Sequence, residues 1–467
     1  MYMLYFFYGL VGALSVAGFI AYKGQGAIYI LFSIVSNTLL FFGFTKKAIF
    51  FDTFIGVFLW LGFWLKLTIR VVFLEGLFHE SIGHFDGSGA AFDRALLVST
   101  CGFFGLIAMS FVRGKLIFTY PIKAKEAGLE GLFKVYQHNR NIILIGFVLF
   151  FFTIALTNVY FGIYQRGALP RTIMPFGLSS IYKWLLLFGL ASFSALILKF
   201  EFTINKKTPY LVVMLSLIEG FMSNVSLLSR GMILNTSALV YGLSKSLKLS
   251  NTKTSFGFIL TSFLAFFLLF SSSVLIVNYM RSVNKSTSIA DVQLITVGMG
   301  APLFLDRWVG IEGVMAVSSY SDLGWHLWED AWKETYSEKK MTFYDANLIT
   351  SPYIYLYKNI ELSNYHYVSL PGVLAFCFYP GSYLFLFGCM FIVGAIATVI
   401  EMSVYKLGGQ NVILCSLLAQ VVAYRFASFG YVPGQSYLLF GSIYFNLFII
   451  YFANKFIVYW HNGAVKT

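Results

Sequence analysis

The sequence predicts an all-α polytopic membrane protein with about twelve transmembrane helices, and three observations support this fold class. First, 58% of the 467 residues are hydrophobic and 11% are charged, whereas about 25% are charged in a typical soluble domain. Second, apolar windows of about 18 residues or more recur along the chain, and each could cross a hydrocarbon core of about 30 Å as a helix. Third, one long aromatic and polar segment interrupts these windows, as expected of a loop outside the bilayer.

The predicted spans divide the chain into three parts. These are a first bundle at 1–278, a loop domain at 279–382 and a second bundle at 383–467. The first span has no basic n-region and no small-residue cleavage site before Lys23, so we expect it to be retained as a helix. The predicted spans are 2–22, 26–44, 48–74, 95–112, 142–163, 180–198, 209–227, 231–245, 255–278, 383–404, 411–427 and 437–455.

The distribution of lysine and arginine predicts the orientation of the chain. Basic clusters, such as Lys46 with Lys47 and Lys245 with Lys248, follow the second, fourth, sixth and eighth spans. Loops rich in these residues stay in the cytoplasm, so both termini are predicted to be cytoplasmic. The net charge of +13 is attributed to these loops and not to nucleic-acid binding. The segments predicted on the outer side are 75–94, 164–179, 279–382 and 428–436.

The long segment 279–382 is predicted to fold, because it carries four tryptophans and few of the Ser/Gly runs that mark disorder. Trp325, Trp328 and Trp332 recur at helical spacing, which predicts a helix with one aromatic face. We expect this helix to lie on the bundle or at the membrane interface, and a sugar-binding platform is the alternative. The apolar stretch 370–385 is interrupted by two prolines, as is typical of a short re-entrant piece.

Basic residues concentrate near the predicted outer ends of the spans. A guanidinium donates two parallel hydrogen bonds to phosphate oxygens and stays charged in a low-dielectric setting. These residues therefore suit a multiply charged anion such as pyrophosphate, and the alternative is snorkelling to lipid headgroups, which we favour for Lys66. The candidate anion-binding residues are Arg70, Arg166, Arg171, Arg230, Arg307 and Arg425.

Carboxylates on the same side are candidate acid and base groups. Glu312 follows Arg307 inside the apolar run DRWVGIEGVMAV, where a solvated charge would be out of place. We therefore prefer Glu312, and an ion pair with Arg307 is the structural alternative. Glu80 and Asp86 are further candidates in the first outer loop. Glu219, in the middle of the seventh span, is interpreted first as a structural hydrogen-bond partner, with a proton relay as the alternative.

The sequence lacks the motifs of several common enzyme classes. The chain has no P-loop, GxSxG, Rossmann or HExxH pattern, so nucleotide-driven work and ordinary hydrolase chemistry are not supported. The four cysteines lie in apolar stretches without metal-ligand spacing, and we expect neither a metal nor another cofactor. No internal repeat is visible, which weighs against transporters built from two related halves.

Five short stretches carry a resemblance to a known family. They are GFWLKLTIRV (62–71), FDGSGAAFDRALLV (85–98), YQRGALPR (164–171), LLSRGMIL (227–234) and RWVGIEGVMAV (307–317). With the layout of spans and loops, the chain resembles bacterial O-antigen and oligosaccharide repeat-unit polymerases. The resemblance implies a GT-C-like fold with a large periplasmic loop domain, in the bacterial inner membrane. It also implies a metal-independent inverting glycosyltransferase that uses undecaprenyl-pyrophosphate oligosaccharides as donor and acceptor. A chain-length regulator of the polysaccharide is a further implied partner.

The resemblance also suggests roles for individual residues. The implied reaction also needs a base that deprotonates the acceptor hydroxyl. No family motif fixes this base, and from its setting in the sequence we choose Glu312, with Glu80 and Asp86 as the next candidates. The family usually has two prominent outer loops, whereas 164–179 is short here. The arginines that would hold the donor pyrophosphate and stabilise the departing group are Arg166, Arg171, Arg230 and Arg307.

Three other functions compete with this interpretation. An O-antigen ligase would share the helices and arginines but use a different acceptor. A lipid-linked oligosaccharide flippase or other transporter would show internal repeats, short loops and charges deep in several helices. In a scaffolding membrane protein, the outer arginines would only anchor the chain at the interface.

Overall fold

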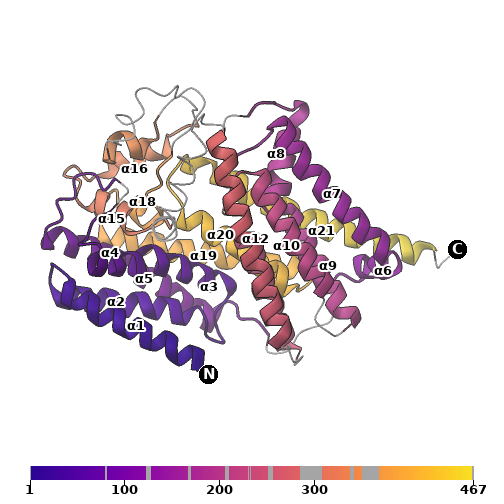
Figure 1. Ribbon diagram of the computed structural model, residues 1–467, viewed down its shortest axis with the longest axis horizontal. Coiled ribbons are helices and arrows are strands. Elements are labelled where there is room, and N and C mark those ends of the chain that lie inside the picture. The colour runs from indigo at the N-terminus through magenta and orange to yellow at the C-terminus, as the bar shows by residue number, and fades with distance from the viewer. Residues whose placement is uncertain are drawn as a thin grey trace. The chain divides into compact units, whose positions relative to one another are not determined.

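The chain is a helical membrane protein. The computed structural model describes residues 2–78, 81–121, 128–166, 170–205, 210–229, 231, 233–250, 256–283, 308–336, 341–349 and 368–464, and these ranges contain helices and no strand (Figure 1). Within them, seven helical segments are long and apolar enough to cross a membrane. These segments are Phe50–Phe73, Gly89–Leu116, Arg140–Phe161, Pro175–Asn205, Leu260–Met280, Tyr383–Leu407 and Pro433–Trp460.

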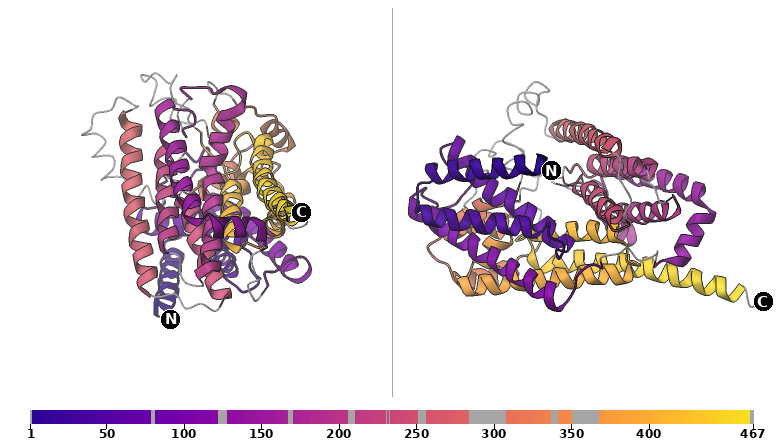
Figure 2. Two further views of the ribbon diagram at one scale, coloured as in Figure 1. Left: turned by 90° about the vertical axis from the view of Figure 1, so that its right-hand side faces the viewer. Right: turned by 90° about the horizontal axis from the view of Figure 1, so that it is seen from below.

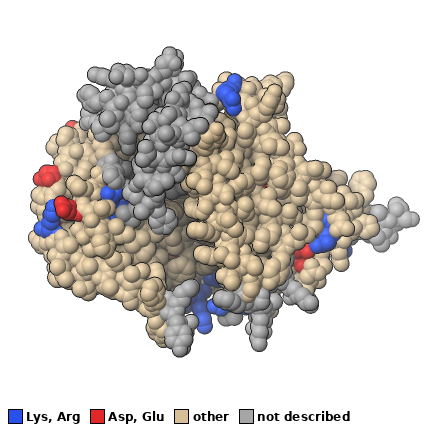
Figure 3. Space-filling model, in the orientation of Figure 1, with Lys and Arg blue, Asp and Glu red and all other residues tan. Residues whose placement is uncertain are grey.

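The remaining predicted spans are also helical, although they are shorter or less apolar. Four apolar helices of 10–17 residues are Tyr5–Ala21, Gly26–Phe42, Tyr210–Ser226 and Val412–Ala427. The composition of the surface also fits a protein surrounded by lipid. The described part of the face in Figure 3 carries only small patches of charged side chains. The full number of twelve spans stays a prediction.

The contacts group the helices into two compact units. The first unit comprises Met1–Thr119, Met299–Val399 and Val422–Ser436. Its elements are α1 (Tyr2–Ala21), α2 (Gly26–Phe42), α3 (Phe50–Leu59), the π-helical turn η1 (Trp60–Leu65), α4 (Lys66–Phe73), α5 (Gly89–Leu116), α15 (Ile311–Ser318), α16 (Trp325–Trp332), η4 (Asp345–Ile349), α18 (Val373–Cys377) and η6 (Pro433–Gln435).

The second unit comprises Tyr120–Gly298, Ile400–Val421 and Tyr437–Thr467. α19 (Tyr383–Leu407) and α20 (Val412–Ala427) contribute residues to both units. The predicted loop domain 279–382 is described only in part, and its boundaries stay a prediction. The other elements of the second unit are α6 (Glu130–His138), α7 (Arg140–Phe161), η2 (Pro175–Gly177), α8 (Leu178–Trp184), η3 (Leu185–Gly189), α9 (Leu190–Asn205), α10 (Tyr210–Ser226), α11 (Ile233–Leu249), α12 (Phe256–Val283) and α21 (Ser436–Ala464).

In the second unit, α10 is the central helix. It contacts α7, α9, α11 and α12, and Figures 1 and 2 show α10 and α12 side by side. Asn158 of α7 is fully buried and donates to the carbonyl oxygen and the hydroxyl of Ser226 in α10, each over 2.9 Å. Its amide oxygen accepts from the backbone N–H of Tyr164, also over 2.9 Å. One side chain therefore joins two helices and orders the loop after α7.

In the first unit, the predicted tryptophan helix forms as α16. Trp328 lies 4.9 Å from Phe376 of α18 and 5.0 Å from Phe385 of α19, measured between ring centroids. Trp332 lies 5.7 Å from Phe376. The aromatic face therefore packs in part on other helices of the unit, as expected of a helix that covers the bundle. Trp325 and Trp332 are still 54% and 42% exposed, and the sugar platform stays a prediction. The predicted re-entrant stretch contains the short, buried helix α18.

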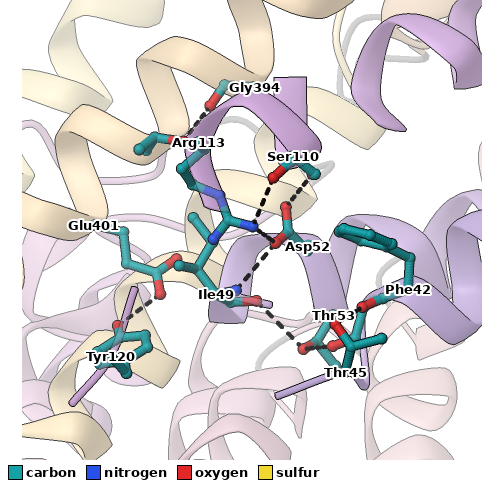
Figure 4. A network of polar contacts seen from close by, with 12 residues as sticks. Phe42, Thr45, Ile49, Asp52, Thr53, Ser110, Arg113, Tyr120, Gly394 and Glu401 are labelled. Atoms are coloured by element: carbon teal, nitrogen blue, oxygen red, sulfur yellow. Dashed lines mark hydrogen bonds and ion pairs between the residues drawn. The ribbon is translucent and has the colours of Figure 1, made fainter. Parts of the chain in front are cut away.

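A buried ion pair joins α3 to α5 in the first unit (Figure 4). Asp52 accepts hydrogen bonds from the backbone N–H of Ile49 over 3.0 Å, from the Ser110 hydroxyl over 2.7 Å and from Arg113 over 2.6 Å. The side chains of Asp52 and Arg113 are 8% and 1% exposed. Asp52 lies in the first turn of α3 and Arg113 in the last turn of α5, so each charge also complements its helix dipole.

We expect the Asp52→Asn variant to lose about 3–5 kcal/mol of unfolding free energy, because the amide leaves the buried Arg113 guanidinium without a balancing charge. The measurement is unfolding of the purified protein in mixed micelles of increasing SDS content. The exposed Asp330→Asn change is the control and should leave the unfolding curve nearly unchanged. Equal curves for the two variants would show that the Asp52–Arg113 pair contributes nothing.

Candidate functional site

A π-helical turn introduces the candidate site. The segment Phe50–Phe73 is one continuous helix in which residues Trp60–Leu65 form the wider turn η1. Such turns shift the register of the residues that follow and occur frequently at functional sites. Lys66 and Arg70 are the first charged residues after it, one helical turn apart on the same face of α4.

Glycines allow η1 and the start of α15 to approach to backbone contact. A Cβ atom on Gly310 would collide with the carbonyl oxygen of Gly62, and a Cβ atom on Gly62 would collide with that of Val309. On the other side, a Cβ atom on Gly313 would collide with the carbonyl oxygen of Pro371. The two glycines of the stretch GIEG are therefore required by close packing around α15.

This approach brings Lys66 to Glu312. The Lys66 Nζ atom lies 2.7 Å from Glu312 Oε1, and the two side chains are 0% and 4% exposed. The same ammonium donates to the carbonyl oxygen of Trp308 over 2.7 Å. Glu312 lies in the first turn of α15, where the helix dipole favours a negative charge. The pair is thus a buried charge centre held between α4, in a candidate membrane span, and the segment that contains α15.

Arg70 shapes the turn that follows α4. Its side chain is buried and Nη1 donates to the carbonyl oxygen of Leu77 over 3.1 Å. The Arg70 carbonyl oxygen accepts from the backbone N–H of Gly76 over 2.8 Å. Inside this turn Glu75 has a φ of 53°, a left-handed conformation that costs free energy for a residue with a side chain. The described contacts of Arg70 organise the backbone, and its role toward an anion stays a prediction.

Glu75 lines a cavity of about 350 Å³ at the end of α4. Tyr22, Lys23 and Phe92 also line it, so one small space is bordered by a carboxylate, an ammonium and two aromatic rings. The Tyr22 hydroxyl donates to Asp93 over 2.9 Å. This mixture of polar and aromatic groups suits a hydroxyl-rich ligand.

Other acids of the segment that follows α15 hold the backbone in place. Glu334 accepts from the backbone N–H of Phe343 over 2.6 Å and from that of Val432 over 2.8 Å. Asp345 accepts from the Thr342 hydroxyl over 2.5 Å and from the backbone N–H of Ser369 over 3.2 Å. These carboxylates order the segments around α15, which is a structural role.

The structure contradicts the prediction made for Lys66 and agrees with the expected burial of Glu312. The prediction that Lys66 snorkels to lipid headgroups is wrong, because its ammonium is fully buried against Glu312. Glu312 is buried, which agrees with the expectation that a charge in this apolar run would not be solvated, and its partner is Lys66. The predicted alternative partner, Arg307, lies outside the described residues, as do Glu80 and Arg230.

The remaining predicted residues make local contacts. Asp86 is exposed and accepts from the backbone N–H of Ser88, and hydrogen bonding from Ser88 lowers the pKa of this carboxyl. Ser88 is the N-cap of α5, so Asp86 belongs to the turn that begins that helix. Arg425 donates to the Ser436 hydroxyl over 2.8 Å and lies 5.5 Å from the ring centroid of Phe429.

Arg166 and Arg171 belong to the second unit. The backbone N–H of Arg166 donates to the carbonyl oxygen of Leu227 over 2.9 Å. The Arg171 side chain donates to the carbonyl oxygen of Val159 over 3.0 Å. The convergence of the outer arginines on one anion stays a prediction. Among the described residues, no group of three His, Cys, Asp or Glu side chains could hold a metal ion.

The sequence analysis gave Lys66 the wrong environment, and it did not identify the Trp308 carbonyl oxygen or the cavity beside Glu75. A lysine inside an apolar span, four residues before an arginine, was a usable signal for a buried charge. The partner of that charge could not be read from the sequence, because it lies in a distant segment.

We expect Lys66→Met and Glu312→Leu each to cost about 3–5 kcal/mol of unfolding free energy, because each leaves one buried charge uncompensated. The double variant should lose less than either single variant, since both charges are gone. The measurement is unfolding of the wild-type protein, the two single variants and the double variant in mixed micelles of increasing SDS content, which together form a double-mutant cycle. Additive losses would contradict a direct interaction between the two side chains.

We also expect Gly310→Ala to destabilise the protein by about 1–3 kcal/mol, because its methyl group forces α15 away from η1. Gly388→Ala in α19 is the matched control, since a Cβ atom there meets nothing within 4 Å and alanine favours the helix. The same unfolding assay compares the two. A neutral Gly310→Ala change would show that the close approach is not needed.

The chain matches no protein-family model, no curated protein and no solved structure. Its function is therefore inferred from the chemistry of the site and from the sequence pattern.

Proposed function

We propose that this protein is a membrane-embedded glycosyltransferase that polymerises undecaprenyl-pyrophosphate-linked oligosaccharide repeat units into O-antigen or a related surface polysaccharide. In this proposal the chain has twelve spans in a GT-C-like arrangement, with cytoplasmic termini and a periplasmic active site. The observation that carries the proposal is the buried Lys66–Glu312 pair, in a protein whose main solvent is lipid. Its lysine lies on α4, the helix whose end borders the cavity beside Glu75. Charges in such a setting are costly and usually serve function.

The proposed reaction needs no nucleotide and no metal. The acceptor hydroxyl attacks the anomeric carbon of the donor sugar, the bond from that carbon to the pyrophosphate oxygen breaks, and undecaprenyl pyrophosphate leaves. The hydroxyl proton passes to a carboxylate, for which Glu312 is the first candidate. To act, Glu312 would exchange its contact with Lys66 for one with the hydroxyl. Lys66 would then offer its positive charge to the departing pyrophosphate, together with the outer arginines.

The cavity beside Glu75 supports a sugar-bearing substrate. Carboxylate and ammonium groups bind sugar hydroxyls through hydrogen bonds, and aromatic rings pack against sugar faces. The candidate acceptor contacts are Tyr22, Lys23 and Glu75. An O-antigen ligase would use the same chemistry with another acceptor, so the product distinguishes the two enzymes.

A lipid-linked oligosaccharide transporter is the second candidate, and one observation favours it. Glu219 is buried in α10, where the Ser223 hydroxyl donates to it over 2.8 Å. An acid inside a membrane helix is a common proton-relay group. A transporter would require Glu219, whereas the polymerase proposal requires Glu312.

The deciding experiment deletes the gene in its host and examines the surface glycan on a gel. Under the polymerase proposal the long-chain ladder disappears, while single repeat units still cap the core. Loss of all capped core would instead indicate a ligase or a transporter. Complementation with wild-type protein should restore the ladder.

Variants at matched membrane levels then test the site. Glu312→Gln should reduce polymer strongly, since loss of a general base typically costs about 10²–10⁴-fold in rate. Glu329→Gln, an exposed change in α16, is the control and should support a full ladder. The Lys66→Met/Glu312→Leu double variant separates chemistry from folding, because it removes both buried charges. A full ladder from this double variant would rule out Glu312 as the base.

A further inference from the structure

A second cavity, of about 700 Å³, lies in the second unit between α6 and the last turns of α21. One part of its lining is polar and comes from Lys134, Gln137, His138 and Asn139. Another part is apolar and includes Phe456 and Trp460. A cavity with two such parts suits an amphiphile, because a purely polar ligand would leave the aromatic part uncovered.

The cavity is built by directed contacts. The backbone N–H groups of Gly131 and Leu132, in the first turn of α6, donate to Asn454 Oδ1 of α21 over 3.0 and 3.2 Å. The Tyr136 hydroxyl donates to Glu201 of α9 over 2.8 Å. Figure 1 shows α6 beside the C-terminal part of α21. These bonds hold α6 in place against α9 and α21. The polar side chains that line the cavity, Lys134, Gln137 and His138, therefore project from a fixed helix.

The end of α21 places the cavity at the membrane surface. The candidate membrane span of this helix ends at Trp460, and tryptophan concentrates at the boundary between hydrocarbon and headgroups. Phe456 and Trp460 are 65% and 67% exposed, and their ring centroids lie 6.1 Å apart. The two rings therefore form an apolar strip that leads from the hydrocarbon toward Lys134.

The charges around the cavity favour an anion. Lys134 is exposed and lines the cavity, whereas Glu130, one helical turn earlier on the same face of α6, is not among the lining residues. Arg140 contacts both carboxylate oxygens of Glu201, so that acid is already balanced. Lysine and arginine in the adjoining predicted loop place this side of the chain at the cytoplasmic leaflet, whose lipids are anionic.

We propose that this cavity binds one anionic phospholipid, with the phosphate at Lys134 and the neighbouring amide and imidazole groups, and with an acyl chain along Phe456 and Trp460. A free anion would use only the polar part, and a zwitterionic lipid would gain less from Lys134. The site lies apart from Glu312 in the sequence and in the other compact unit, so it does not depend on the proposed catalytic function.

The test measures quenching of tryptophan fluorescence in the full-length protein in neutral detergent micelles. Phosphatidylglycerol and phosphatidylcholine with brominated acyl chains serve as the two probes. The difference between wild-type protein and Trp460→Phe isolates the signal of Trp460. Brominated phosphatidylglycerol should quench it with about fivefold higher apparent affinity than the phosphatidylcholine, as expected for one lysine near the membrane surface. Lys134→Glu should remove this preference.

Lys46→Glu is the matched control, because it makes the same charge change at an exposed lysine of the other unit, on the same predicted side of the membrane. This control should keep the fivefold preference. Equal quenching by the two lipids in the wild-type protein would overturn the proposal. Equal losses in Lys134→Glu and Lys46→Glu would also overturn it, as would displacement of the brominated lipid by inorganic phosphate, which would indicate a site for a soluble anion.

Discussion

The rest of the structure depends on one constraint: hydrocarbon offers no hydrogen bonds, so polar groups inside the bilayer must find partners within the protein. Asp52 and Arg113 satisfy each other between two helices, and Asn158 joins α7 to α10. Because an unmatched buried charge is far more costly than a missing apolar contact, such pairs decide which helices lie together. Lys66 and Glu312 follow the same rule between a candidate span and the segment that contains α15.

Close backbone packing makes the Lys66–Glu312 pair possible. Gly62 and Gly310 allow η1 and α15 to touch, which brings the Lys66 ammonium within reach of Trp308 and Glu312. A larger residue at either glycine would separate the two elements, and the ion pair would open. The Lys66–Glu312 ion pair therefore depends on the two glycines that let the backbones touch as much as on the charged residues themselves.

This arrangement places opposing demands on Glu312. A buried ion pair stabilises the fold only while both partners remain, whereas a catalytic base must be free to accept a proton. Both demands are met if substrate replaces one contact of the pair as it binds. Under the proposed function, the cavity beside Glu75, at the far end of α4 from η1, would hold the sugar-bearing substrate. In the second unit, the cavity between α6 and α21 is the site proposed for an anionic lipid.

The sequence by itself determined the helical membrane class and the helix at Trp325–Trp332, because hydropathy and helical periodicity are local properties of the chain. It also singled out Glu312, since a charge in an apolar run is visible locally. Only the tertiary structure decided that Lys66 is buried and not snorkelling, because the depth of a side chain depends on which segment covers it. The partner of Glu312 comes from a distant stretch, and long-range pairing leaves no periodic signal in a single sequence.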